Sequence, residues 1–134
     1  MSNSVASGVA YSDPEFTTMY ASAEIGYTAA AQGTVTQLTD KGTAVTLNKS
    51  AGRITMNNAA LAGNTAVSFT MNNTSISTSD TIIVNVSVGA TTGAYTSYVT
   101  SMTSGSAILT LRNLTSGSLS EAVILNYSII HGAS

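Results

Sequence analysis

The chain has 134 residues, which suits one domain with a core that needs no covalent staples. Charged residues make up only 7% of it, against about 25% in average soluble proteins, and it has no cysteine. Four Lys and Arg residues are too few for a phosphate-binding surface, and the missing cysteine excludes disulfides and thiolate chemistry. No apolar run approaches the roughly 18 residues of a membrane span, and the first residues lack the pattern of a signal peptide. We therefore expect no nucleic-acid or membrane partner, and synthesis in a cytoplasm.

Residues 1–32 differ in composition from the rest of the chain. They hold the only proline, half of the acidic residues and irregularly spaced large side chains. Their aromatic residues are Tyr11, Phe16, Tyr20 and Tyr27. One interpretation is a frayed terminus with one strand near residues 25–29. The other is an extended arm that docks on another protein, because aromatic side chains are unfavourable in water and a segment that orders on binding buries them.

From Gly33 onward the dominant sequence period is two, which is the period of a β-strand. The clearest strand covers residues 65–72, where Val67, Phe69 and Met71 are expected to face the core. Residues 57–64 are expected to form one helical turn between Asn58 as cap and a glycine as terminator. The expected strands, in chain order, lie at 35–38, 43–48, 53–56, 65–72, 80–88, 94–102, 106–113 and 120–130.

Roughly eight or nine short strands without a long helix predict an all-β protein, either a sandwich or a barrel, with a jelly roll as the favoured form. We expect an extended N-terminal arm at residues 1–32, with at most one short strand, and a β-sandwich domain at residues 33–134. A small monomer with so few charges has weak colloidal repulsion, which favours a protein that works within an assembly.

Two of the expected strands carry apolar residues on both faces. Ile83 in the strand at 80–88 lies opposite the main apolar face, and so do Ile124 and Ile130 in the strand at 120–130. A sheet face in contact with water carries mostly polar residues. Single exposed apolar residues are common, but their recurrence on two strands favours a packed second face. We predict that Ile83, Ile124 and Ile130 line a contact between copies of the chain.

The sequence shows little that could carry catalysis. The single histidine is His131, and no GxSxG turn accompanies it, so a Ser-His-acid triad is not expected. The acidic residues show neither calcium-loop nor paired-carboxylate spacing, and Asp40 and Asp80 are interpreted as turn formers. Asn-x-Ser/Thr triplets are expected by chance in a chain so rich in Ser and Thr. The sequence therefore predicts no enzyme, no metal site and no cofactor.

The block from Gly33 to Gly132 contains four motifs in fixed order: GTVTQ, VTLNKxxGxITMNNAxL, AVSFT and SGSLSEAVILNY. With these motifs it resembles a β-module of virion structural proteins of tailed bacteriophages. The resemblance covers about the last three quarters of the chain, and residues 1–32 carry none of its motifs. It implies an oligomeric virion component, made in the host bacterial cytoplasm, and it fits both head proteins and fibre or spike proteins.

Two functions are therefore expected. The first is a capsid decoration (cement) protein on the capsid surface, a trimer held on the major capsid protein by the arm aromatics Tyr11, Phe16, Tyr20 and Tyr27. The second is a receptor-binding or fibre-tip domain whose exposed loops recognise a host polysaccharide or protein. A fibre protein usually carries a long shaft, and this chain has no heptads or fibrous repeat, which favours the first.

Overall fold

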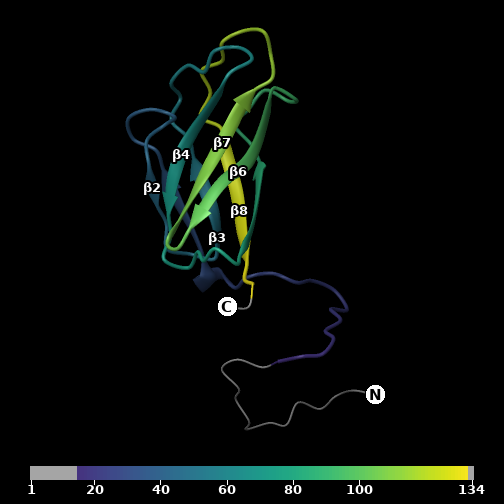
Figure 1. The fold of residues 1–134 in the computed structure, drawn as a ribbon. Coiled ribbons are helices and arrows are strands. Elements are labelled where there is room, and N and C mark those ends of the chain that lie inside the picture. Colours follow the sequence, from purple (N-terminus) through teal and green to yellow (C-terminus); the bar gives the residue numbers. More distant parts are fainter. Residues whose placement is uncertain (1–14, 133–134) are drawn as a thin grey trace.

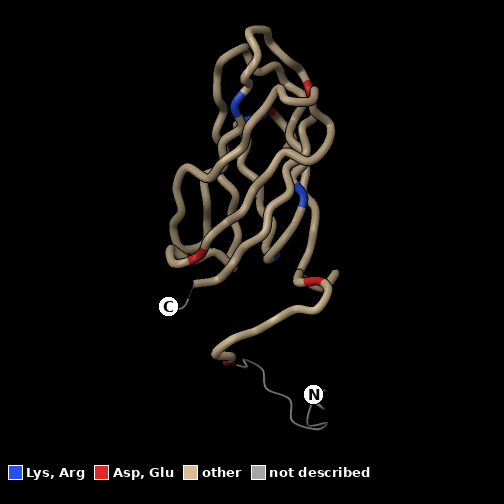
Figure 2. The backbone as a smooth tube through the Cα atoms, turned by 90° about the vertical axis from the view of Figure 1, so that its right-hand side faces the viewer, with Lys and Arg blue, Asp and Glu red and all other residues tan. Residues whose placement is uncertain are grey.

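The structure is a computed structural model and describes residues 15–132 (Figure 1). Two four-stranded sheets pack face to face, so the chain is an all-β sandwich, as the alternating sequence pattern predicted. The described N-terminal segment, residues 15–28, runs away from one end of the sandwich, and β8 ends at that same end (Figure 1). Charged residues are few and scattered along the backbone (Figure 2).

The first sheet has the strand order β1-β3-β8-β5. β8 is a central strand that pairs antiparallel with both β3 and β5, whereas β1 pairs parallel with β3. A short 3₁₀-helix, η1 (Ala29–Ala31), precedes β1. The bounds of the strands are β1 Gln32–Thr36, β3 Ala51–Thr55, β8 Ile124–Ile130 and β5 Thr81–Val86.

The second sheet has the strand order β2-β4-β7-β6. β2 pairs parallel with β4, and β7 pairs antiparallel with β4 and β6. A β-bulge between Val99 and Ser101 shifts the register of β6 against β7. The bounds of the strands are β2 Val45–Thr46, β4 Ala66–Asn72, β7 Ser106–Asn113 and β6 Tyr95–Thr103.

The core lies between the two sheets and consists of the side chains that point inward from every second residue along the strands. Phe69 and Met71 of β4 are buried, as the period-two pattern predicted. Each large apolar side chain buried in this way contributes about 1.5–3 kcal/mol, so the two inner faces hold the sheets together. The largest fully buried apolar side chains are Ile54, Met56, Met71, Leu109, Leu111, Leu125, Ile129 and Val123.

The jelly-roll detail of the expected fold is not confirmed. A jelly roll contains Greek keys, which are built from antiparallel strands. Here the chain crosses from β1 to the other sheet for β2 and returns as β3, parallel with β1, and it repeats this crossing from β2 to β4. The two parallel pairs are a feature that hydrophobic alternation alone does not reveal.

The helical turn predicted at residues 57–64 does not form. The side-chain oxygen of Asn57 accepts a hydrogen bond from the backbone N–H of Ala59 at 2.8 Å, which fixes a turn instead. Leu61 then forms an isolated antiparallel bridge with Leu119, an extended pairing that a helix would exclude. A Cβ on Gly63 would lie 2.2 Å from the Ser116 carbonyl oxygen, so the role of this glycine is close backbone packing.

Several strand ends also differ from the prediction. The first strand begins at Gln32 and ends at Thr36, so Leu38 lies beyond it and is 85% exposed. The strand expected at 80–88 ends at Val86, so Val88 lies past the end of β5 and is exposed. No strand forms between residues 25 and 29; the described chain before β1 contains only the turn η1.

Two buried asparagines tie down the loops at opposite ends of the sandwich. The side-chain amide of Asn73 donates to the Lys49 carbonyl at 2.7 Å. The amide of Asn113 donates to the carbonyls of Leu61 and Gly117 at 3.0 and 2.8 Å. Both amide groups lie in Asn-x-Ser/Thr triplets, and their burial and bonding agree with the interpretation of these triplets as chance occurrences.

Candidate functional site

The first sheet has an outer face that is turned away from the core. Along β8 every second residue is buried, so the residues between them lie on the outer face. The register places Ile83 of β5 opposite Ser128 of β8. It also places Arg53 of β3 between Asn126 of β8 and Thr34 of β1. Residues from all four strands therefore share this face.

The root of the N-terminal arm is bound beside this face. The hydroxyl of Tyr27 donates a hydrogen bond to the carbonyl of Ile129 in β8. Gln32 Nε2 donates to the Tyr27 carbonyl at 2.8 Å, and Lys49 Nζ donates to the Ala30 carbonyl at 2.9 Å. These contacts fix the last residues before β1 against the sheet, so the arm forms one wall of a groove.

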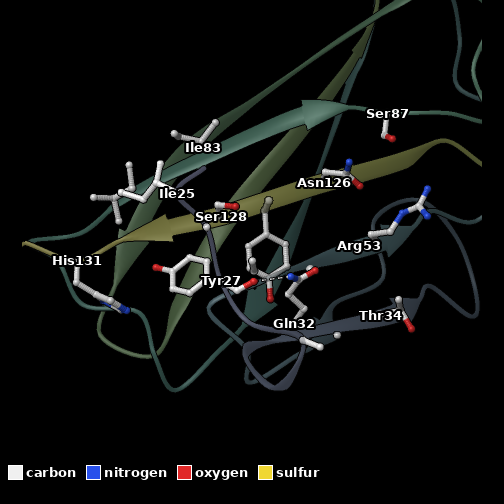
Figure 3. Close-up of a pocket in the computed structure, with 17 residues that line it drawn as sticks. Ile25, Tyr27, Gln32, Thr34, Arg53, Ile83, Ser87, Asn126, Ser128 and His131 are labelled. Carbon is white, nitrogen blue, oxygen red and sulfur yellow. Dashed lines mark hydrogen bonds between the residues drawn. The ribbon is translucent and has the colours of Figure 1, made fainter. Parts of the chain in front are cut away.

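The groove encloses about 1110 Å³ between the arm root and the outer face of the first sheet (Figure 3). One end of it is apolar, because Ile25, Ile83 and Ile130 line it and are 79%, 54% and 56% exposed. Figure 3 shows Ile25 of the arm beside Ile83 of β5. Large side chains that gather in this way and remain exposed are typical of a contact surface.

The other end of the groove is polar. Arg53 is exposed, and within residues 15–132 its guanidinium forms no ion pair. Oδ1 of Asn126, its cross-strand neighbour, is buried and has no hydrogen-bond partner in the described chain. Buried polar atoms in folded proteins nearly always have a partner. The groove thus offers an unpaired cation next to an apolar rim, whereas the buried Asn126 Oδ1 is shielded from a ligand in the groove.

The structure places the predicted interface residues unequally. Ile83 and Ile130 line the groove, whereas Ile124 lies on the same face but is half-buried and outside the groove. Sequence reasoning missed Ile25, because it belongs to the arm, and it missed Arg53. The outward position of Arg53 in its strand was a usable signal, since the buried Ile54 fixes which face is inner.

The arm aromatics also divide into two groups. Phe16 and Tyr20 are 65% and 91% exposed, so they are available to a partner. Tyr27 is half-buried and bonded to its own domain through Ile129, so its hydroxyl is already occupied. Tyr11 lies outside the described residues.

His131 lies beside Asp80 at the end of the sandwich from which the arm leaves. His131 Nδ1 is 3.2 Å from Asp80 Oδ1, and the Asp80 side chain is almost fully buried. The carboxylate also accepts the backbone N–H groups of Ser77 at 2.7 Å and Gly132 at 3.1 Å. The hydrogen bond from Ser77 is the main cause that lowers the pKa of Asp80. Within the described chain no serine hydroxyl bonds to His131, so the pair clamps the tail against the start of β5.

A second polar cluster lies at the opposite end. Lys41 is buried, and its ammonium donates to the carbonyls of Asn57 and Glu121. Burial lowers the pKa of Lys41, and the charge of Glu121 partly opposes this effect. The Glu121 carboxylate accepts hydrogen bonds from the side chain of Thr91 at 2.7 Å and from its backbone, which lower the pKa of Glu121. Burial and the nearby negative charge of Glu121 raise the pKa of Tyr95 to about 12. The buried hydroxyl of Tyr95 has no hydrogen-bond partner in the described chain.

Within residues 15–132 no group of three or more His, Asp or Glu side chains is placed to hold a metal ion. No helix in that range is long and apolar enough to cross a membrane. Comparison of the chain with protein-family models, with characterised proteins and with solved structures found no match. The structure therefore shows an all-β sandwich with an exposed N-terminal segment and a groove on one sheet.

Proposed function

We propose that the chain is a structural protein of a tailed-bacteriophage virion, a capsid decoration (cement) protein that binds the head surface and stabilises it. One observation carries the proposal: a segment with exposed Phe16, Met19 and Tyr20 extends from a rigid sandwich (Figure 1). Exposed large apolar side chains on an extended segment are typical of a segment that orders on a partner. The motif resemblance between residues 33 and 132 supports the virion assignment.

The proposed partners are the major capsid protein, reached by the arm, and further copies of the chain, with a trimer preferred. The exposed isoleucines of the groove, Ile25, Ile83 and Ile130, support the contact between copies. A contact there removes apolar surface from water, which contributes a favourable free energy of about 25 cal/mol per Å² of buried surface. The same contact accounts for a surface with very few charges, because part of it is covered in the assembly.

Deletion of residues 1–20 tests the arm. The core begins with β1, and the arm root at Tyr27 is retained, so the shortened chain should fold. We expect the shortened chain to remain soluble and to fail to co-sediment with undecorated heads. A full-length variant with Phe16→Ser and Tyr20→Ser should bind more weakly for the same reason. Full occupancy of the heads by the shortened chain would place the attachment surface on the β-sandwich and refute the arm assignment.

A receptor-binding or fibre-tip domain is the alternative. Its support is the exposure of Leu38 and Leu114, which are 85% and 49% exposed in loops of the sandwich. These loops follow β1 and β7 at the end away from the arm (Figure 1). Counting copies in purified virions by mass spectrometry separates the two functions. Hundreds of copies fit a head protein, whereas a few to a few dozen copies fit a fibre or spike and contradict the decoration role.

A further inference from the structure

The groove on the first sheet has two features that nothing in the described chain satisfies. Arg53 has no anionic partner, and three isoleucines on the rim are more than half exposed. A single ligand that satisfies both would bring a carboxylate and apolar side chains. A peptide segment with acidic and large apolar residues has both of these groups.

The N-terminal arm has this chemistry. Residues 1–31 hold three of the six acidic residues and no Lys or Arg, so the arm is negative while every basic residue lies in the sandwich (Figure 2). Glu15 and Glu24 are exposed, and neither forms an ion pair within the described chain. Large apolar side chains lie between them in the sequence, and these are exposed as well.

We propose that the groove binds the arm, residues 15–24, of a second copy of the chain, with a carboxylate of Glu15 or Glu24 on Arg53. This inference rests on the homo-oligomer of the proposed function and names the segment that forms its contact. Arg53 and the arm glutamates do not pair within one chain. The groove carries a positive charge and the arm carries negative charges, and these do not pair within one chain. Such complementary charges favour binding between the arm of one copy and the groove of another.

The reach of the arm suits such an exchange. About ten residues in extended conformation span roughly 33–36 Å, which is enough to cross to a neighbouring domain. An arm in a neighbour's groove is a head-to-tail contact. Such contacts form a ring when the rotation between copies closes, and a trimer is one such ring, whereas they form an open filament when it does not. An extended segment turns alternate side chains to opposite sides, so an arm bound to a neighbour keeps one side for the capsid.

Charge reversal tests this contact in solution without capsids. Sedimentation velocity of the full chain over a concentration series measures the dissociation constant of the oligomer. We expect Arg53→Glu to raise this constant by at least about tenfold, because the arm and groove then repel each other. The arm variant with Glu15→Lys and Glu24→Lys should show the same loss. Combining the three substitutions should restore most of the association, since the charges are exchanged.

Arg112→Glu is the matched control, because Arg112 is exposed in β7 of the other sheet. It should leave the oligomer unchanged. Circular dichroism melts show whether each variant is folded. A monomeric wild type, an unchanged oligomer in Arg53→Glu, or no recovery in the combined variant would each overturn the inference. Loss of head binding by Arg53→Glu with an intact oligomer would assign the groove to the capsid and overturn it too. The sedimentation results do not depend on whether the wild type decorates heads, so the two proposals fail separately.

Discussion

Replacement of Tyr127 by Phe removes one hydroxyl from the interior of the sandwich. Tyr127 is 3% exposed, and its hydroxyl donates to the Lys49 carbonyl at 2.9 Å. That carbonyl keeps a second donor, because Asn73 Nδ2 lies 2.7 Å from it. Phe fills the same space, so no cavity forms. The hydroxyl also has two long contacts of 3.4 Å, to the Leu47 carbonyl and from Asn73 Nδ2, and both of these groups keep another hydrogen bond. The main loss is therefore the bond to Lys49, without a stranded partner, and we expect the free energy of unfolding at pH 7 to fall by about 1 kcal/mol.

The same variant changes the response of the protein to alkali. Burial raises the pKa of Tyr127 from 10.0 to about 12. The folded state thus holds this proton more tightly than the unfolded chain, so the contribution to stability is complete below pH 10 and is lost as the pH rises toward 12. At pH 11 the wild type should have lost about 1.4 kcal/mol through this group. Tyr127→Phe lacks this loss, so the two proteins should be about equally stable near pH 11.

Urea unfolding followed by circular dichroism measures the free energy of unfolding of each protein at pH 7 and at pH 11. Tyr98→Phe serves as the control, because Tyr98 is 43% exposed on the other sheet. Its free energy of unfolding at pH 7 should stay within about 0.5 kcal/mol of the wild type. A difference between wild type and Tyr127→Phe that is the same at both pH values would refute the reasoning. So would a loss above about 3 kcal/mol at pH 7, since that requires a stranded polar group.

Three further outcomes are expected. Asp80→Asn should be less stable than the wild type at pH 7 and should lose less stability on acidification. The lowered pKa of Asp80 stabilises the fold above pH 3.8, and that stability is lost as the pH falls. Thermal melts between pH 2 and pH 7 measure both effects. Asn113→Ala should lower the free energy of unfolding by roughly 2–4 kcal/mol, since the fully buried amide is bonded to backbone groups at both of its polar atoms; an unchanged urea midpoint would contradict this. Ile83→Asp should dissociate the oligomer by placing a charge in an apolar contact, and light scattering that still reports the wild-type mass would exclude Ile83 from that contact.

Much of the fold could be predicted from alternation alone. β4 is the clearest case, because Phe69 and Met71 alternate with small polar residues and only one assignment buries both. The strand bounds of β6 and β7 follow the predicted ranges closely for the same reason, and β8 ends where predicted but begins at Ile124 and not at residue 120. The parallel pairs could not be predicted, because period two fixes which side chains face inward but does not specify which strands pair with one another.

Less of the candidate site could be predicted. Two of its isoleucines, Ile83 and Ile130, stood out because they broke the polar pattern of an outer face. Ile25 could not be assigned, since only the bonded Tyr27 brings that part of the arm to the sheet. Lys41 was unpredictable for a related reason: its burial depends on carbonyls from two distant loops. Contacts between segments far apart in the sequence leave no local period.

The central place of β8 in the first sheet bears on how the chain folds. β8 is the last strand in sequence order, yet β3 and β5 each depend on it for pairing, with Ala51 opposite Ser128 and Thr81 opposite Ile130. The first sheet therefore cannot close until residues 124–130 have joined it. Pairings this distant in sequence require the closure of long loops before any contact forms, and proteins dominated by them fold in milliseconds to seconds. Until then the edge of β3 that pairs with β8 stays without its partner strand, while the arm needs no partner strand and is ready from the start.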